Sequence, residues 1–175
     1  RLSRLVGNVL DFSRIESGRQ DYRLEPTVLA DTVRNAVEEL RGPIEDAGFQ
    51  VDASYTGDTT ALADHSAVDS AVANLIANAV KYSGDGSEIG VSVAGQEDSV
   101  TIEVLDRGIG VAEADREEIF EKFKRGRNAG DVTGTGLGLA LVKDVMIGHG
   151  GTAEVVSLDG GGSVLRLRFI RGIST

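Results

Sequence analysis

Two asparagines and a lysine recur on one face of the segment 69–83. Asn74, Asn78 and Lys81 are spaced by four and three residues, which brings their side chains onto one side of a helix. Amide oxygens can coordinate a cation such as Mg²⁺, amide nitrogens can donate to phosphate, and a lysine adds a compact positive charge. This face could therefore hold a metal-bound polyphosphate. The simpler explanation, two asparagines on a solvent face, is weakened by the glycine motifs downstream.

The other residues of this helix fit that use. Its opposite side carries an apolar stripe that a core would bury: Val68, Val72, Leu75, Ile76 and Val80. The side chains that accompany the polar residues on their own face are short: Ala67, Ser70, Ala71 and Ala77. We therefore expect nothing large to block a ligand from the polar face.

The first glycine motif, residues 106–110, follows an expected strand and reads Asp-Arg-Gly-Ile-Gly. Its glycines allow positive φ and a close approach of the backbone. Asp106, at the end of the strand, can accept a hydrogen bond from an exocyclic amine such as that of adenine. Taken alone, a simple Asp-Gly turn would explain the same residues.

A second glycine motif runs directly into a helix expected over residues 137–147. The free N–H groups and the positive dipole end of a helix start favour an anion. The candidate phosphate-binding segment consists of Gly134, Thr135, Gly136, Leu137 and Gly138. Neither glycine motif has the Gly-x-Gly-x-x-Gly spacing of a dinucleotide site, and a P-loop is absent from the sequence.

Residues 111–133, between the two glycine motifs, combine a short expected helix at about 115–123 with a polar stretch. Ile119, Phe120 and Phe123 form an apolar edge that we expect to anchor this helix. The nearby basic side chains are Lys122, Lys124, Arg125 and Arg127. We interpret the segment as a lid whose positive charges meet the phosphates of ATP.

The remaining elements must position these motifs. Periodicity predicts an amphipathic helix over residues 1–18, an extended segment at 22–29 and a helix from about 31 to 44. Residues 49–55 and 60–63 flank a Thr-Gly-Asp turn and predict a hairpin.

Two further antiparallel strand pairs are expected from alternating apolar residues. They cover residues 89–93 with 100–104, and 152–158 with 163–170. Each strand would bury one face, so a sheet with helices segregated to one side accommodates all the apolar stripes. The pattern therefore predicts an α+β fold in layers.

Composition excludes several classes of function. The formal net charge of −10 argues against a nucleic-acid surface. The absence of cysteine excludes disulfides, zinc–thiolate sites and thiol nucleophiles. No apolar run approaches the ~20 residues that span a bilayer, and no signal peptide is visible. Because the sequence begins at Arg1 in helical register, we expect it to be part of a longer chain.

Four of these motifs resemble, in order, the N, G1, F and G2 boxes of bacterial sensor histidine kinases. They are residues 74–83, 106–110, 119–123 and 134–139. The catalytic domain of those kinases shares its ATPase superfamily with gyrase, heat-shock chaperones and mismatch-repair ATPases. The resemblance implies the Bergerat fold, a two-layer α/β sandwich with a mixed, mainly antiparallel sheet of about five strands and three helices on one face.

The resemblance also implies a division into domains. Residues 19–175 would be the catalytic ATP-binding domain. Residues 1–18 would be the last part of the second helix of the dimerisation and phosphoacceptor domain, and would thus precede the sandwich as one N-terminal helix.

Site residues follow from matching the boxes position by position. Asn78 would coordinate Mg²⁺, and Asn74 would assist at the metal or the phosphates. Lys81 would contact phosphate, Tyr82 would pack near the nucleotide, and Arg125 would reach the terminal phosphate. Around the adenine, Asp106 would accept a hydrogen bond from the exocyclic amine. Gly108 and Gly110 would shape the wall of the adenine site. The second glycine motif, residues 134–138, would line the phosphate side.

By this resemblance the chain binds Mg-ATP and passes the γ-phosphate to a histidine outside the sequence, then to an aspartate of a response regulator. In the family the phosphoacceptor histidine lies upstream of Arg1, so no autophosphorylation is expected of this chain alone. Neither His65 nor His149 has an acceptor-type sequence context. We expect both to be structural or exposed.

Two alternatives remain open. A non-catalytic nucleotide-sensing module would keep the same boxes. An anti-sigma-type serine kinase is disfavoured by Asn74, because relatives of that class and ATP-hydrolysing members carry a glutamate there as a general base, whereas asparagine cannot take a proton.

The expected partners are the chain's own phosphoacceptor domain and a response regulator, without nucleic acid or membrane contact. We expect a monomer or a weak dimer from this sequence and a dimer from the full protein. Its expected location is the cytoplasm, as the cytoplasmic part of a membrane-bound sensor.

Overall fold

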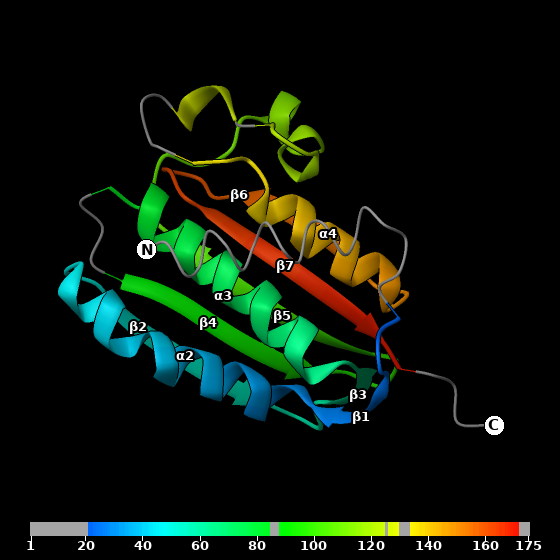
Figure 1. Ribbon diagram of the computed structural model, residues 1–175. Helices are drawn as coiled ribbons and strands as arrows, with labels where there is room; N and C mark the ends of the chain where they lie inside the picture. The colour runs from blue at the N-terminus through cyan, green and yellow to red at the C-terminus, as the bar shows by residue number, and fades with distance from the viewer. Residues whose placement is uncertain (1–20, 85–87, 125, 130–133, 172–175) are drawn as a thin grey trace.

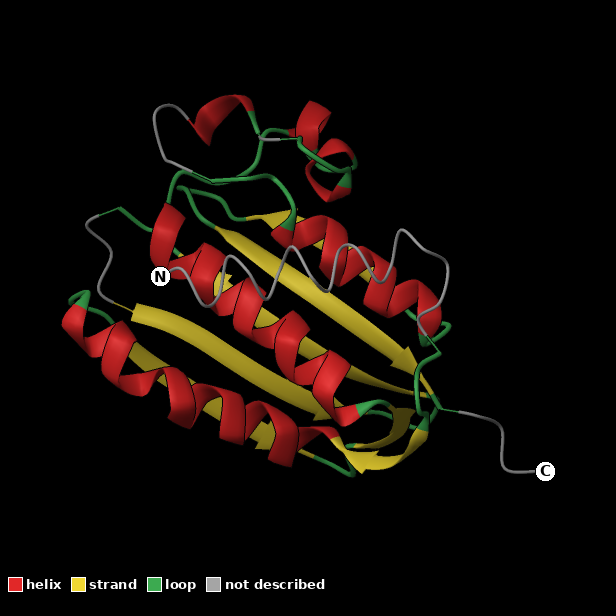
Figure 2. Ribbon diagram, in the orientation of Figure 1, coloured by secondary structure: helices red, strands yellow, loops and turns green. Residues whose placement is uncertain are grey.

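A five-stranded sheet forms one layer of the protein, and α-helices cover one of its faces (Figures 1 and 2). The computed structural model describes residues 21–84, 88–124, 126–129 and 134–171. In spatial order, the strands are β2 (Gln50–Thr56), β4 (Glu88–Gly95), β5 (Ser99–Asp106), β7 (Ser163–Ile170) and β6 (Thr152–Ser157). The helices are α2 (Leu29–Asp46), α3 (His65–Tyr82) and α4 (Gly138–Gly148).

The sheet is mixed but mainly antiparallel. Strands β2 and β4 run parallel, and the other three pairs of neighbours run antiparallel. Alternation along each strand buries one face, as in β5, where Val100, Ile102 and Val104 lie in the core. The α3 helix packs between α2 and α4 over this face. The predicted α+β two-layer sandwich is confirmed, while the helix expected over residues 1–18 lies outside the described residues.

The hairpin predicted for residues 49–55 and 60–63 is wrong. Strand β2 pairs with β4, whereas β3 (Thr60–Ala63) pairs antiparallel with β1 (Glu25–Val28) in a separate two-stranded sheet. Gly57 in the connecting turn has φ +70°, and a Cβ there would stand 2.6 Å from the Gly95 carbonyl oxygen. The turn therefore packs against the end of β4 and directs the chain out of the main sheet.

The start of α3 is fixed by Asp64 and His149. The Asp64 carboxylate accepts a hydrogen bond from the Ala67 N–H at 3.1 Å and caps the helix. His149 is buried; its Nε2 accepts from the Asp64 N–H at 2.9 Å, and its Nδ1 lies 2.7 Å from the Val145 carbonyl oxygen. The expectation of a structural role for His149 is confirmed.

Within α3 the apolar stripe packs against the core as expected, although Val80 is only partly buried. One correction concerns the polar face. Ala71 is fully buried against the core, although its spacing predicts a place among the short residues of the polar face. Because α3 packs between two other helices, its buried arc is wider than a single-sided stripe predicts. None of the described helices is long and apolar enough to cross a membrane.

The prediction of a short helix at about 115–123 is also wrong. The chain there forms two 3₁₀ turns, η1 (Glu113–Asp115) and η2 (Glu118–Phe120). Glu121 is already extended, and Phe123 has φ +62° and donates its N–H to the Gly136 carbonyl oxygen at 3.0 Å. This long-range bond ends the helical path, and a local periodicity cannot reveal it.

Candidate functional site

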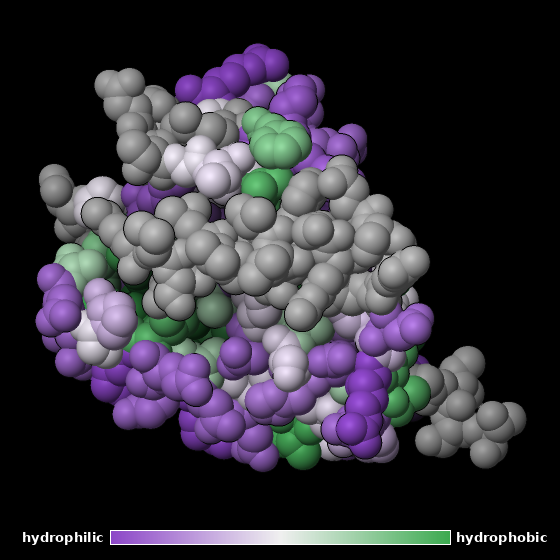
Figure 3. Space-filling model, viewed as in Figure 1, coloured by the Kyte–Doolittle hydropathy of each residue, from purple (hydrophilic) through white to green (hydrophobic). Residues whose placement is uncertain are grey.

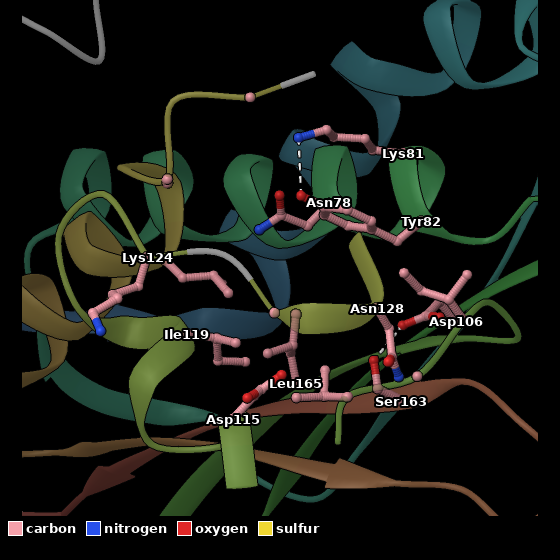
Figure 4. Close-up of a pocket in the computed structure, with 18 of the residues that line it drawn as sticks. Asn78, Lys81, Tyr82, Asp106, Asp115, Ile119, Lys124, Asn128, Ser163 and Leu165 are labelled. Atoms are coloured by element: carbon pink, nitrogen blue, oxygen red, sulfur yellow. Dashed lines mark hydrogen bonds between the residues drawn. The ribbon is translucent and has the colours of Figure 1, made fainter. Parts of the chain in front are cut away.

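A pocket of about 470 Å³ lies between the polar face of α3, the ends of β5 and β7, and the loops that precede α4 (Figure 4). It brings together ten of the thirteen site residues that the resemblance implies: Asn74, Asn78, Lys81, Tyr82, Asp106, Gly110, Gly134, Thr135, Gly136 and Gly138. Residues up to 64 positions apart in the sequence, such as Asn74 and Gly138, thus line one cavity.

Three predicted residues are not among those lining the pocket. Arg125 lies outside the described residues. Leu137 is buried and immediately precedes α4, which begins at Gly138. Gly108 packs instead against the end of α3, where a Cβ would stand 1.9 Å from the Tyr82 carbonyl oxygen. That same oxygen accepts a hydrogen bond from the Ile109 N–H at 3.2 Å. Gly108 therefore allows the loop after β5 to approach α3.

The polar face of α3 presents its side chains in an ordered way. Asn74 donates from Nδ2 to the Ser70 carbonyl oxygen at 2.9 Å, and its Oδ1 lies 3.0 Å from the position that a Cβ on Gly138 would take. Lys81 donates from Nζ to the Tyr82 hydroxyl at 3.0 Å and lies 4.6 Å from the centre of that ring (Figure 4). Asn78 lines the cavity between them. The face combines amide groups with one cation.

Asp106 is a buried carboxylate at the end of β5. Its Oδ1 accepts a hydrogen bond from the Gly108 N–H at 2.9 Å, and its Oδ2 accepts one from the Ser163 hydroxyl at 2.6 Å (Figure 4). Two donors therefore fix the orientation of the carboxylate in the pocket wall. An exocyclic amine that reaches this wall would meet an oriented acceptor.

The loop before α4 is shaped by Gly136. This residue has φ +70°, and a Cβ on it would stand 2.9 Å from the backbone of Phe123 and of Lys124. The first N–H groups of α4 have no partner within the helix, and Gly138 and Leu139 at this start line the pocket. The arrangement suits an anionic group, since the positive end of the helix dipole faces the cavity.

The segment 111–129 only partly matches the expected lid. Ile119 and Phe120 are buried and anchor it as predicted, but the Phe123 side chain is 69% exposed. Two of the basic residues there face acidic ones: Lys124 Nζ lies 3.4 Å from Glu118, and Arg127 Nε lies 3.2 Å from Asp115. The Lys124–Glu118 pair is exposed on both sides, and such ion pairs contribute only about 0–1 kcal/mol. A polyphosphate could therefore compete for Lys124.

The end of η2 is tied to α4 by a charge pair. Lys143 Nζ donates to the Glu121 carboxylate at 2.7 Å. This hydrogen bond, with the positive charge of Lys143, lowers the pKa of Glu121 below its ordinary value. The carboxylate therefore stays ionised over the physiological range and links the two elements beside the pocket.

Sequence reasoning missed three polar residues of the pocket: Asp115, Asn128 and Ser163. Ser163 is the first residue of β7 and the direct register partner of Asp106. Pairing the last predicted strand with the strand that ends at Asp106 would have found it. Asp115 and Asn128 come from an irregular segment whose path local patterns do not predict.

Comparison with known proteins assigns the family. Residues 63–172 match the family described as histidine kinase-, DNA gyrase B-, and HSP90-like ATPase. The chain belongs to this family. It is 33% identical over 169 residues, or 95% of its length, to the sensor-like histidine kinase SenX3 of Mycobacterium bovis. It is 38% identical over 167 residues, or 93% of its length, to the histidine-protein kinase/phosphatase MprB of Mycobacterium sp. (strain KMS).

The solved structures agree with this assignment. Full-length ShkA in complex with AMPPNP superposes with a TM-score of 0.81 at 26% identity, over 98% of this chain and 36% of ShkA. The chain spans 41% of SenX3 and 31% of MprB, so it covers less than half of either relative. Its fold and sequence are those of the catalytic ATP-binding domain of sensor histidine kinases, as the boxes predicted.

Proposed function

We propose that this pocket binds ATP with Mg²⁺ and presents the γ-phosphate for transfer to a histidine outside the sequence. The observation that carries the proposal is the buried Asp106 carboxylate, oriented by the Ser163 hydroxyl and the Gly108 N–H. It offers an acceptor for the adenine amine in the same cavity that holds the amides of α3 and the start of α4. The ShkA structure was solved with AMPPNP, which supports a nucleotide as the ligand here.

On the phosphate side we propose roles for the residues of α3. Asn74 and Lys81 would contact phosphate oxygens, and Tyr82 would pack beside the nucleotide and hold Lys81 through its hydroxyl. Gly134, Thr135, Gly136 and Gly138 would surround the phosphates with backbone N–H groups. Arg125, which lies outside the described residues, would reach the terminal phosphate. Each assignment is consistent with the position of the described residues on the cavity wall.

The donor set fits Mg²⁺ carried by the nucleotide. No group of three His, Cys, Asp or Glu side chains suited to a metal exists among the described residues, whereas Asn78 offers an amide oxygen to the cavity. Mg²⁺ often combines few protein ligands with phosphate oxygens and water. When bound, the ion would neutralise phosphate charge in the transfer step.

Transfer to a protein histidine is favoured over hydrolysis. Asn74 cannot take a proton from water, so the pocket lacks a general base at that position. Phosphoryl transfer depends chiefly on positioning and charge stabilisation, which the oriented side chains of α3 and the α4 start supply. We further propose that the phosphoacceptor domain of the same protein, whose last part would be residues 1–18, receives the phosphate and passes it to a response regulator. This chemistry requires ATP and therefore a cytoplasmic location.

Calorimetric titration with AMPPNP, with and without Mg²⁺, tests the proposal. We expect binding that weakens without the metal, and loss of binding in Asp106→Asn, which replaces one acceptor oxygen by a donor amide. Asp52→Asn, an exposed residue of β2, is the matched control and should bind like the wild type. Equal affinity of the Asp106→Asn variant and the wild type would rule out the proposed role of that carboxylate.

A second assay separates the kinase from the alternatives. The chain is extended upstream to include the phosphoacceptor helix and incubated with γ-labelled ATP. A histidine kinase gives an acid-labile phosphohistidine, a serine kinase gives acid-stable phosphoserine on a partner, and a nucleotide sensor gives neither. Sedimentation of the short and the extended chain then tests the expected change from monomer or weak dimer to dimer.

A further inference from the structure

Asp115 is a buried carboxylate in the pocket wall. It is only 3% exposed, and both of its oxygens meet Arg127: Oδ2 accepts from the backbone N–H at 2.7 Å, and Oδ1 lies 3.2 Å from Nε. The Arg127 side chain is itself 74% exposed. A buried carboxylate is costly unless it is hydrogen-bonded and paired. Arg127 supplies both partners from a position twelve residues along the chain.

Asp115 belongs to the η1 turn, which is attached to the sheet by hydrogen bonds. Its N–H donates to the Ala112 carbonyl oxygen at 2.9 Å. The neighbouring Val111 carbonyl oxygen accepts from the Ser157 hydroxyl, at the end of β6, at 2.6 Å. The η1 turn is therefore held against the end of β6 and provides a fixed point beside the pocket. Figure 4 shows the Asp115 side chain at the pocket.

The residues on either side of Arg127 line the cavity. Gly126 and Asn128 both face it, and η3 (Arg127–Ala129) is a single turn. A Cβ on Gly126 would stand 3.7 Å from Asp115 Oδ2 and 3.8 Å from Ile119, so this segment runs directly over the carboxylate. The bonds from Asp115 to Arg127 thus determine where the segment 126–129 lies in the pocket wall.

We infer that Asp115 is a positioning residue of the nucleotide site. It acts through Arg127, holds the segment 126–129 against η1, and so keeps the Asn128 amide at the cavity where a nucleotide polar group can meet it. The inference rests on the proposed function for its effect on affinity. The contact between Asp115 and Arg127 is a property of the protein without nucleotide.

The first experiment therefore uses the protein without nucleotide. Amide hydrogen exchange is measured for Arg127 in the wild type, in Asp115→Ala and in Glu113→Ala, which removes an exposed acid from the same turn. We expect exchange about tenfold faster in Asp115→Ala, since a charge-assisted hydrogen bond is lost. The Glu113→Ala variant should match the wild type. Unchanged exchange at Arg127 in Asp115→Ala would overturn the inference.

The second experiment measures AMPPNP affinity by calorimetry, together with the urea unfolding midpoint of each variant. We expect about tenfold weaker binding in Asp115→Ala. Arg127→Ala keeps the backbone bond and should lose only about two- to threefold, with Arg127→Lys close to the wild type. Asn128→Ala should weaken binding while leaving Arg127 exchange unchanged. This order of affinities would not follow from a general loss of stability.

The outcomes also distinguish the inference from the proposed function. If the wild type binds no nucleotide, the proposed function fails, and the exchange at Arg127 still tests the positioning contact. If the wild type binds AMPPNP and Asp115→Ala binds it equally well, Asp115 has a structural role only and the inference is wrong. Should Asp115→Ala fail to fold, Asp115→Asn and Arg127→Ala carry the same comparison, because each retains one of the two bonds.

Discussion

Ser163 stands directly opposite Asp106 in the β5–β7 ladder, and its hydroxyl donates to Asp106 Oδ2 at 2.6 Å. Both residues are buried, and the second carboxylate oxygen accepts from the Gly108 N–H. The carboxylate is thus held from two directions by donors on two different segments. Its orientation is fixed before any ligand arrives, which lowers the cost of ordering it on binding.

Removing the hydroxyl should weaken this arrangement. In Ser163→Ala, Asp106 Oδ2 loses a charge-assisted hydrogen bond worth about 1.5–3 kcal/mol. We expect adenine nucleotide affinity to fall by about one order of magnitude and the free energy of unfolding to decrease by about 1–2 kcal/mol. Calorimetry with AMPPNP and urea unfolding measure the two effects. Ser163→Thr retains the hydroxyl and serves as the control; if it loses affinity as Ser163→Ala does, the hydroxyl is not the cause.

The sequence predicts the helix-borne part of the site well and the sheet-borne part incompletely. Asn74, Asn78 and Lys81 share a face because helix periodicity is local, so their spacing suffices. Asp106 is marked by the end of a strand and the glycines after it. Ser163 enters the site only through the register of two strands whose first residues are 64 positions apart. That register depends on which strands become neighbours in the sheet, and a local sequence pattern does not predict which strands pair.

The same difference between local patterns and long-range contacts explains two errors in the predicted fold. A glycine turn joins residues 49–55 to 60–63 and favours pairing them, yet the partner of 60–63 is β1, a segment that the sequence marks only as extended. The helix expected at 115–123 fails because Phe123 bonds to Gly136, thirteen residues away. In both cases a tertiary contact overrides a correct local preference.

The contact between Gly138 and Asn74 leads to a prediction about affinity. A Cβ on Gly138 would stand 3.0 Å from Asn74 Oδ1, so Gly138→Ala should displace that amide from its place beside the α4 start. We expect nucleotide binding to weaken several-fold, with little loss of stability. The control is Gly42→Ala in α2, where a Cβ meets nothing within 4 Å. Because Pro43 follows and disfavours a helical residue with a Cβ before it, that change should not bring the usual gain in stability of a helical Gly→Ala substitution, and it should leave calorimetric affinity unchanged. Unaltered binding in Gly138→Ala would argue against the Asn74 position as part of the site.

Gly136 and Gly160 form a matched pair for backbone conformation. Both have positive φ, +70° and +90°, so alanine at either position costs about 1 kcal/mol or more. Only at Gly136 would the new Cβ also meet backbone atoms, those of Phe123 and Lys124 at 2.9 Å, while Gly160 has open space. We expect Gly136→Ala to lower the urea midpoint more than Gly160→Ala and to be the only one of the two that weakens AMPPNP binding. Similar losses in both variants would show that φ alone decides the cost.

The cap of α3 predicts a dependence of stability on pH. Partial burial works against ionisation of Asp64, but the hydrogen bonds from the N–H groups of Ala67, Arg23 and Ser66 outweigh it, so the pKa of Asp64 lies below its ordinary value. A carboxyl whose pKa is lower in the folded state stabilises the protein above its unfolded pKa of about 3.9. This contribution is lost as the pH falls through the folded value.

Replacing Asp64 tests this sign directly. We expect Asp64→Ala to lose about 1 kcal/mol of unfolding free energy at pH 7, the usual cost of a lost N-cap, and the difference from the wild type to shrink below pH 4. Asp64→Asn keeps a capping oxygen without the charge, so its stability should stay close to that of the wild type at pH 7 and should not carry this acid-dependent contribution. Urea unfolding at pH 7 and pH 3 measures both variants. A deficit in Asp64→Ala that is as large at pH 3 as at pH 7 would mean that the ionised carboxylate contributes nothing beyond the geometry of the cap.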